Sequence, residues 1–268
     1  MANSINTNYG AQVALQNLNA TNSALNTTQN RVNTGMKVSS AKDSGAIFAI
    51  ATNQRADMAA MDAVKTSIQR GQSIVDVALA AGDTVVAALT EMKSIAVALE
   101  GFGATPPTGN KSYDAYKADY DALKTEVTDA LKGATFDSVN LFTTAASGTS
   151  QPKVRTGLAT TSTFSIGFST GWADLDLTAM TAQGVQDAIT SFTTSLSTLG
   201  TQSKSMDRQL TFVSKLQDSL ETGVGNLVDA DLAKESARLT ALQTKQQLGV
   251  QALSIANSSS QIMLSLFR

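Results

Sequence analysis

The sequence offers four acidic residues as candidates for a carboxylate pair that could bind a metal or transfer a proton: Asp57, Asp62, Asp229 and Asp231. Asp229 and Asp231 are two residues apart, and on an α-helix side chains with that spacing do not share a face. They precede a long apolar segment, a place that suits acids at the positive end of a helix. We therefore interpret them as part of a helix start rather than as a catalytic pair.

Other reactive groups are missing from the composition. The 268-residue chain has no cysteine and no histidine. This excludes disulfides, zinc sites of the usual Cys/His type, thiol catalysis and histidine-based triads. No glycine-rich phosphate loop ending in lysine occurs either. The sequence therefore predicts a protein that is not an enzyme and needs no cofactor.

Charge and hydropathy narrow the choice of partners. The net charge is −2, and no basic patch interleaved with aromatic residues is present. A nucleic-acid partner is therefore not expected. The N-terminus lacks the basic and apolar regions of a secretory signal peptide, and no run of eighteen apolar residues predicts a membrane span.

The two ends of the chain carry the clearest pattern. Both are long and place apolar residues at alternating +3 and +4 steps, the pattern of a helix that buries one face against a partner. Asn22, Gln29 and Gln246 fall on the same stripes, where buried amides fix register at some cost in stability. We predict that the two ends pair with each other and with other copies. The residues expected to make this self-assembly surface are Leu15, Leu18, Leu25, Val32, Leu242, Leu253, Met263 and Phe267.

The same ends contain almost no acids. Asp43 is the first acidic residue and Glu235 the last, which leaves 42 residues before and 33 after them without a carboxylate. We interpret this as avoidance of like-charge repulsion where many copies converge on one axis.

Between the ends the sequence predicts long helices over residues 43–100, 111–132 and 181–222, and the N-terminal helix covers 4–34. Gly35 ends the first helix, Ser40 to Asp43 resembles a capping box that starts the second, and Gly223 with Gly225 ends the last before the C-terminal helix begins. Short β-type segments are expected at 136–142 and 163–168, and the second alternates cleanly. The expected core of this region includes Leu89, Leu196, Leu210 and Val213.

These elements together predict a mainly α fold. We expect an elongated antiparallel helical bundle or coiled coil with a small β-hairpin region. Residues 1–38 and 226–268 would pair as an inner terminal-helix domain. Residues 39–225 would form an outer helical rod, with the hairpins and loops in 133–180.

Several motifs resemble those of bacterial flagellins. At the N-terminal end these are SINTN (4–8), LNATNSAL (18–25), SSAKDSGAIFAIA (39–51), QRGQSIVDVALAA (69–81) and FDSVNLF (136–142). At the C-terminal end they are DADLAKES (229–236), LGVQALSIAN (248–257) and LSLFR (264–268). The ordered set at both termini is specific, and the short middle resembles a minimal flagellin without large outer domains.

The resemblance implies a secreted subunit of the extracellular flagellar filament, used for swimming. It implies export of the unfolded chain by the flagellar type III apparatus and polymerisation at the distal tip. Its partners would be copies of itself, other flagellins, an export chaperone and the filament cap. A hook–filament junction protein is the alternative, and an exported adhesin or a coiled-coil regulator is a third possibility.

Overall fold

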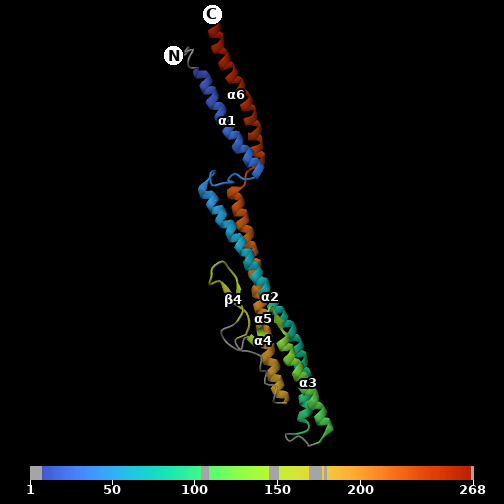
Figure 1. Ribbon diagram of the computed structural model, residues 1–268. Coiled ribbons are helices and arrows are strands. Elements are labelled where there is room, and N and C mark those ends of the chain that lie inside the picture. The colour runs from blue at the N-terminus through green and yellow to red at the C-terminus, as the bar shows by residue number, and fades with distance from the viewer. Residues whose placement is uncertain (1–7, 104–108, 145–150, 169–176, 178–179, 267–268) are drawn as a thin grey trace. The chain divides into compact units, whose positions relative to one another are not determined.

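The computed structural model describes residues 8–103, 109–144, 151–168, 177 and 180–266, without the side chains of Thr144 and 259–266. The mainly α fold with small β-hairpins is confirmed (Figure 1). The helices are α1 (Tyr9–Thr34), α2 (Gly45–Glu100), α3 (Lys111–Gly133), α4 (Leu141–Thr144), α5 (Ala182–Val228) and α6 (Leu232–Leu266). The strands are β1 (Thr135–Phe136), β2 (Val139–Asn140), β3 (Lys153–Arg155) and β4 (Thr163–Ser165).

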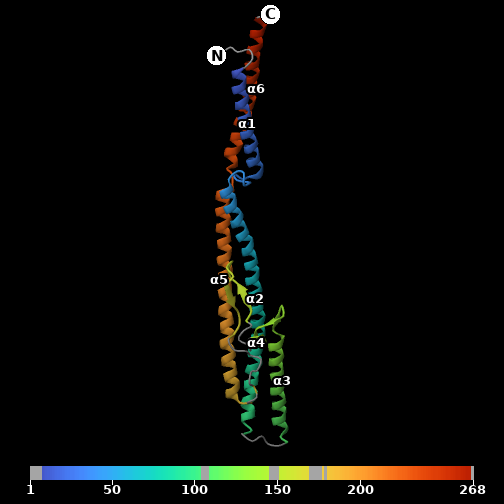
Figure 2. The ribbon, with the colours of Figure 1, turned by 60° about the vertical axis from the view of Figure 1, so that its left-hand side comes forward.

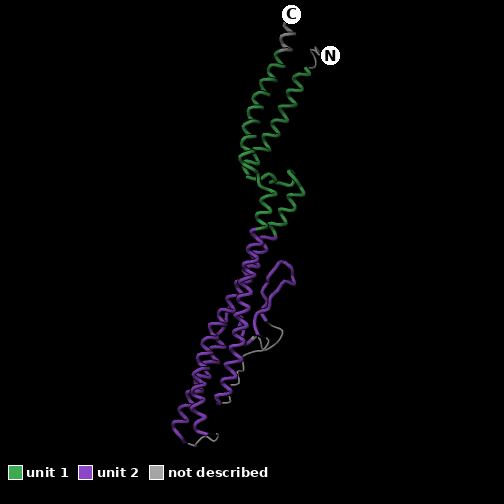
Figure 3. Tube along the Cα trace, turned by 180° about the vertical axis from the view of Figure 1, so that it is seen from behind, with its two compact units in different colours: residues 1–56, 219–268 green, residues 57–218 purple. Residues whose placement is uncertain are grey.

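The chain divides into two compact units, drawn in separate colours in Figure 3. Unit 1 consists of residues 1–56 and 219–268, and unit 2 of residues 57–218. In unit 1, α1 and α6 run side by side in opposite directions in both ribbon views (Figures 1 and 2). In unit 2, long parts of α2 and α5 pair with each other and α3 lies alongside (Figure 2).

Side-chain hydrogen bonds fix the antiparallel register of α2 and α5 in unit 2. Asp62 accepts from Gln217 at 2.8 Å, Gln72 donates to Asp207, and Gln186 accepts from Lys93 at 2.6 Å. As the residue number rises along α2, it falls along α5. Between these polar bridges lie fully buried side chains, among them Ile68, Val75, Leu89, Met92, Phe192, Leu199 and Met206.

Of the four residues expected in the core of the outer region, Leu89 and Val213 are buried. Leu196 and Leu210 are partly exposed. Leu196 nevertheless lies directly over Gly82 of α2, where a Cβ atom would collide with its methyl groups.

The β-hairpins are both small and antiparallel. β1 and β2 are joined by Asp137 and Ser138, which both have positive φ, 49° and 62°, as a two-residue hairpin turn requires. β3 pairs with β4 in the register Val154 to Phe164. Val154 and the residue just after β4, Ile166, pack onto Gly71 of α2, so the lack of a side chain at Gly71 lets this hairpin approach the helix.

The expected helix end at Gly223 and Gly225 is wrong. Helix α5 continues through both glycines to Val228. Glycine costs roughly 1 kcal/mol relative to alanine inside a helix, but Val224 and Val228 are buried here and hold the last turns in place. Tertiary packing therefore overrides the local preference to stop.

The expected capping box at Ser40 is also wrong as a helix start, because α2 begins at Gly45. The Asp43 carboxylate accepts the backbone N–H groups of Ser39 and Ser40, both at 3.0 Å, and both of their hydroxyls. These hydrogen bonds lower the pKa of Asp43 below its usual 3.8, with the backbone N–H of Ser39 as the largest cause. The motif closes a turn before the helix instead of capping it.

Helix α2 is long and apolar enough to span a membrane by length and composition, with a mean hydropathy of 1.6 over eighteen residues. The same properties belong to the central helix of a bundle. Within unit 2 its apolar side chains recur at helical spacing and are buried against α5 and the hairpins. We therefore interpret α2 as a core helix.

A candidate self-assembly surface on the terminal helices

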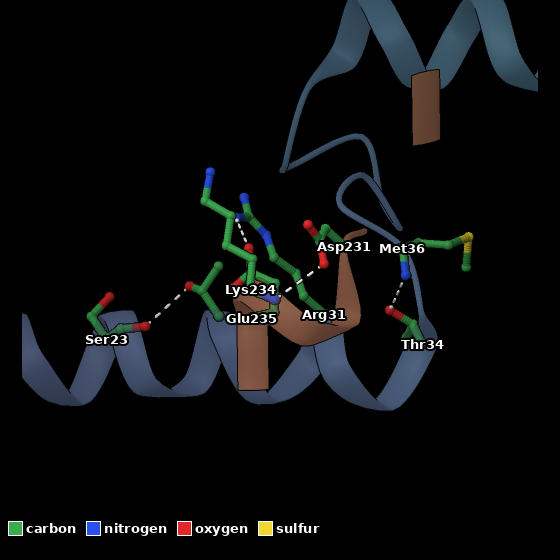
Figure 4. Close-up of polar contacts among 8 residues, drawn as sticks. Ser23, Arg31, Thr34, Met36, Asp231, Lys234 and Glu235 are labelled. Carbon is green, nitrogen blue, oxygen red and sulfur yellow. Dashed lines mark hydrogen bonds and ion pairs between the residues drawn. The ribbon is translucent and has the colours of Figure 1, made fainter. Parts of the chain in front are cut away.

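Local sequence signals define both ends of the terminal helix pair. Asn8 caps α1 by accepting the N–H of Ala11 at 3.0 Å, and Gly35 ends α1 with φ at 69°. Asp231 caps α6 by accepting the N–H of Lys234 at 3.1 Å (Figure 4). The prediction that an aspartate at 229 or 231 starts the last helix is therefore confirmed, with Asp231 in that role.

Backbone hydrogen bonds join the two chain segments at the base of this pair. Lys37 donates to the carbonyl of Val228 at 2.6 Å, and Ala230 donates to that of Gly35 at 2.9 Å. Met36 and Asp229 form an antiparallel bridge between these bonds. The end of α1 and the start of α6 are thus fastened together although about 190 residues of sequence separate them.

The faces of α1 and α6 that meet are called the seam. On α1 it consists of the less exposed residues at +3 and +4 steps, and on α6 of the corresponding set. The α1 side is Ala11, Ala14, Leu18, Thr21, Leu25, Thr28 and Val32. The α6 side is Glu235, Leu239, Leu242, Gln246, Gly249, Leu253 and Ala256.

Four contacts set the alignment of the seam. Asn8 donates to the carbonyl of Ala256 at 2.7 Å at one end, and Arg31 contacts Glu235 at 3.2 Å at the other. Between them, the Gln246 amide donates to Asn22 at 2.7 Å. Leu18 lies over Gly249, so close that an added Cβ would be 3.2 Å from a Leu18 methyl.

The predicted assembly residues are placed as follows. Leu18, Leu25, Val32, Leu242 and Leu253 lie on the seam. Leu15 is exposed and lies off the seam. The smaller Ala14 occupies the seam position that was predicted for Leu15. The side chain of Met263 and all of Phe267 lie outside the described residues.

The seam buries little apolar surface. Among the described residues of α1, Leu25 is the one large apolar side chain that is buried, and the others buried are Thr21 and Thr28. Among the described side chains of α6, the one that is buried is the charged Glu235. Because most helical stability in water comes from packing, a pair with so thin a seam gains little from its own contacts.

A second apolar stripe on α6 is not among the residues predicted from the sequence. Ala241, Leu248 and Ile255 are seven residues apart, with Ala252 beside them, and all four are exposed. We call these four residues the outer lane. Leu248 is 61% and Ile255 69% exposed. The signal was present in the sequence as a second heptad repeat, offset from the first.

Helix α1 also exposes apolar residues off the seam. Tyr9 and Val13 are exposed, as is Leu15. The basic residues Lys234, Arg238 and Lys245 of α6 are exposed too, and no acid follows Glu235 in the sequence. In the part of the chain that the structure describes, no cluster of acidic residues could hold a metal ion. The apolar part of this surface can therefore bind another apolar surface.

The chain is similar to known proteins of one family over nearly its whole length. Residues 5–147 match the family model for the bacterial flagellin N-terminal helical region, and residues 182–267 match that for the C-terminal helical region. The chain is 50% identical to flagellin FljK of Caulobacter vibrioides, with 99% of each chain covered. It is 36% identical to a flagellin of Brucella melitensis, with the same coverage, and 32% identical to flagellin C of Rhizobium meliloti, again over 99% of each.

Proposed function

The chain belongs to the bacterial flagellin family and is a structural subunit of the flagellar filament, and we propose that it polymerises through the faces of α1 and α6 that its own fold leaves uncovered. It is not an enzyme. The observation that carries the proposal is the outer lane: a regular apolar stripe on a helix whose other apolar stripe already covers α1. A helix with two such stripes needs two partners.

The outer lane has the right chemistry for a partner that is another copy. Burying a leucine or isoleucine side chain completely stabilises an assembly by about 1.5–3 kcal/mol, so Leu248 and Ile255 make a substantial contribution at every subunit. We infer that the lane packs against a different face of the neighbouring copy. Contact between two different faces of neighbouring copies is heterologous, and a heterologous contact that does not close into a ring propagates as a helical filament.

We assign the inner domain of the subunit to residues 1–38 and 226–268 and the outer helical domain to 39–225. In this proposal the seam residues Leu18, Leu25, Val32, Leu242 and Leu253 hold α1 and α6 together. Leu15, Met263 and Phe267 join the outer lane in contacts between copies. Leu89, Leu196, Leu210 and Val213 stabilise the outer domain.

Assembly outside the cell requires a route of export. We propose that the unfolded chain leaves through the flagellar type III export apparatus, escorted by an export chaperone, and adds beneath the cap at the distal tip. The absence of cysteine supports passage as a single unfolded thread. Other flagellins are possible partners in the same filament, because the chain matches several flagellins of one organism, including FljK and FljO of Caulobacter vibrioides, over nearly its whole length. The alternative of a hook–filament junction protein is not favoured, since these full-length relatives are flagellins.

Seeded polymerisation tests the proposal. Short filament seeds are mixed with soluble chain and elongation is measured by electron microscopy. Ile255→Asp places a carboxylate in the outer lane, and an unpaired buried charge costs several kcal/mol, so we expect no elongation. Ile255→Leu keeps an apolar side chain of the same size and should elongate. Normal elongation by Ile255→Asp would contradict the proposal.

A further inference from the structure

One contact across the seam joins charged groups. Arg31 is the only charged residue in the sequence of α1, and its Nη1 lies 3.2 Å from Oε1 of Glu235 in α6. Figure 4 shows both side chains at the base of the terminal pair, beside the Asp231 cap. Arg31 lies in the last turn of its helix and Glu235 in the first turn of its own, so each charge is favoured by the helix dipole at that end.

The carboxylate of the pair is buried and the guanidinium is partly exposed, with 28% of the Arg31 side chain accessible. Glu235 is 9% exposed, and its Oε2 and the Nε of Arg31 are shielded from solvent without a hydrogen-bond partner among the described residues. When a buried carboxylate loses its cation, its desolvation penalty is no longer offset by the attraction of the ion pair. Any movement that separates the two side chains therefore penalises the whole seam.

The sequence provides no second partner for Arg31 along α6. If α1 slides by one turn towards the C-terminal end of α6, Arg31 comes level with Arg238. If it slides by one heptad, Arg31 comes level with Leu242. No acid follows Glu235 anywhere in the chain, so neither position supplies a carboxylate. In the opposite direction α6 begins at Leu232, and a slide of one turn brings Arg31 level with Asp231, whose carboxylate already accepts the N–H of Lys234 as the helix cap.

We propose that Arg31 and Glu235 act as a positioning pair that specifies the register of α1 against α6, and that the lack of acids after Glu235 excludes registers in which α1 has slipped towards the C-terminal end of α6. This inference rests on the proposed function, because a single register is what presents the same outer lane on every copy. A buried polar or charged contact that selects one alignment in an otherwise repetitive seam is a known device of coiled coils. The apolar seam residues alone repeat every seven positions and tolerate a slide of one heptad.

Engineered cysteines report the register directly, since the natural chain has none. An added Cβ at Gly10 would lie 4.0 Å from Cβ of Ala256, within the range that a disulfide bridges. Gly10→Cys with Ala256→Cys therefore reports the native register. Asn17→Cys with Ala256→Cys, one heptad along α1, reports the slipped register in which Arg31 faces Leu242. Both reporters are oxidised after the full chain has been added to seeds of unmodified protein, and intramolecular bridges are separated from dimers on a non-reducing gel.

In the natural background we expect the native bridge to form and the slipped bridge to be rare. Arg31→Met with Glu235→Met removes both charges and keeps the length of both side chains, so the pair can still pack. We expect the native-to-slipped ratio to fall by roughly tenfold or more, the size of effect seen when coupled partners are removed. Reversal of the pair, Arg31→Glu with Glu235→Arg, should restore part of the native bridge, because the ion pair forms again although both helix dipoles now oppose the charges; a role in packing alone would not explain this recovery.

An unchanged ratio in the Met/Met chain would overturn the inference. If the Met/Met chain does not add to seeds, the chain with the reversed pair is measured instead. Addition of that chain with the native bridge supports the inference. If it does not add, although both cysteine reporters add in the natural background, the inference is overturned. Failure of the proposed function looks different, because the unmodified chain would then not extend seeds at all.

Discussion

Helices of unit 2 and the terminal pair of unit 1 carry apolar residues at the same helical spacing, but they bury them to different degrees. In unit 2, α4 and α5 stack Phe142 on Phe192 with ring centroids 5.7 Å apart, and both side chains are fully buried. In the terminal pair, Leu25 is the one large apolar side chain buried in the described seam, beside threonines and an ion pair. Unit 2 therefore buries large apolar side chains within one chain, whereas the terminal pair leaves large apolar side chains such as Leu248 and Ile255 exposed.

A heptad pattern therefore indicates that a helix has a partner, but it does not indicate which chain supplies that partner. The residue types on the stripe distinguish the two regions. Unit 2 fills its core with aromatic and large aliphatic residues, and the terminal helices use alanine, threonine and amides on the seam and place Leu248 and Ile255 outside. Small residues allow close approach of two helices but bury little area, so the pair gains little stability from its own contacts.

The largest expected effect comes from the same truncation made in both regions. Leu199→Ala removes a fully buried side chain of unit 2, and we expect the free energy of unfolding of the soluble monomer to fall by about 2–5 kcal/mol. Leu248→Ala removes an exposed one, so monomer unfolding should change by less than about 0.5 kcal/mol while seeded elongation slows. Denaturant titration of monomers and electron microscopy of seeded samples measure the two. Equal destabilisation of both monomers would contradict the difference in burial between Leu199 and Leu248.

A smaller effect is expected from glycines that receive a neighbouring side chain. At Gly71 in unit 2, an added Cβ would collide with Val154 and lie 2.8 Å from Ile166, both held in the core. Gly71→Ala should therefore destabilise the monomer by about 1–3 kcal/mol. At Gly249 the added Cβ would be 3.2 Å from one Leu18 methyl that can move, and alanine gains helix propensity, so Gly249→Ala should be nearly neutral in the monomer.

Gly200→Ala is the control for helix propensity alone, because an added Cβ there has no neighbour within 4 Å. It should stabilise the monomer by about 0.5–1 kcal/mol. If Gly249→Ala destabilised the monomer as much as Gly71→Ala, the seam would be as tightly packed as the core of unit 2.

The smallest expected effect is the pH dependence of the turn before α2 in unit 1. Hydrogen bonds from Ser39 and Ser40 lower the pKa of Asp43 in the folded chain, so its ionised form favours the fold. The stabilisation is present above the unfolded-state pKa and is lost as the pH falls through the lower folded-state value. Asp43→Asn should therefore be slightly less stable than the natural chain at neutral pH, with the difference vanishing in strong acid. A difference that grew on acidification would show that the carboxylate does not act this way.

Much of this architecture was predictable from local patterns. The long helices, the strand that begins at Thr163 and three seam residues of α6, Leu242, Gln246 and Leu253, follow from spacing and turn residues. The pattern also offered Leu15, whereas the structure places the smaller Ala14 on the seam, because hydrophobicity alone favours the larger residue and close helix packing favours the smaller. The continuation of α5 through Gly223 depended on packing of Val224 and Val228, which no local signal contains. The outer lane was missed because one helix was assigned one stripe.

Hydrogen exchange on monomer and filament shows whether other copies cover the terminal pair while unit 2 is complete within one chain. Amides of α1 and α6 should exchange fast in the soluble monomer and become protected in the filament, because their stability comes from contacts between copies. Amides of α2, α3 and α5 in unit 2 should be protected in both states. Strong protection of α1 and α6 in the monomer, equal to that of unit 2, would contradict the account.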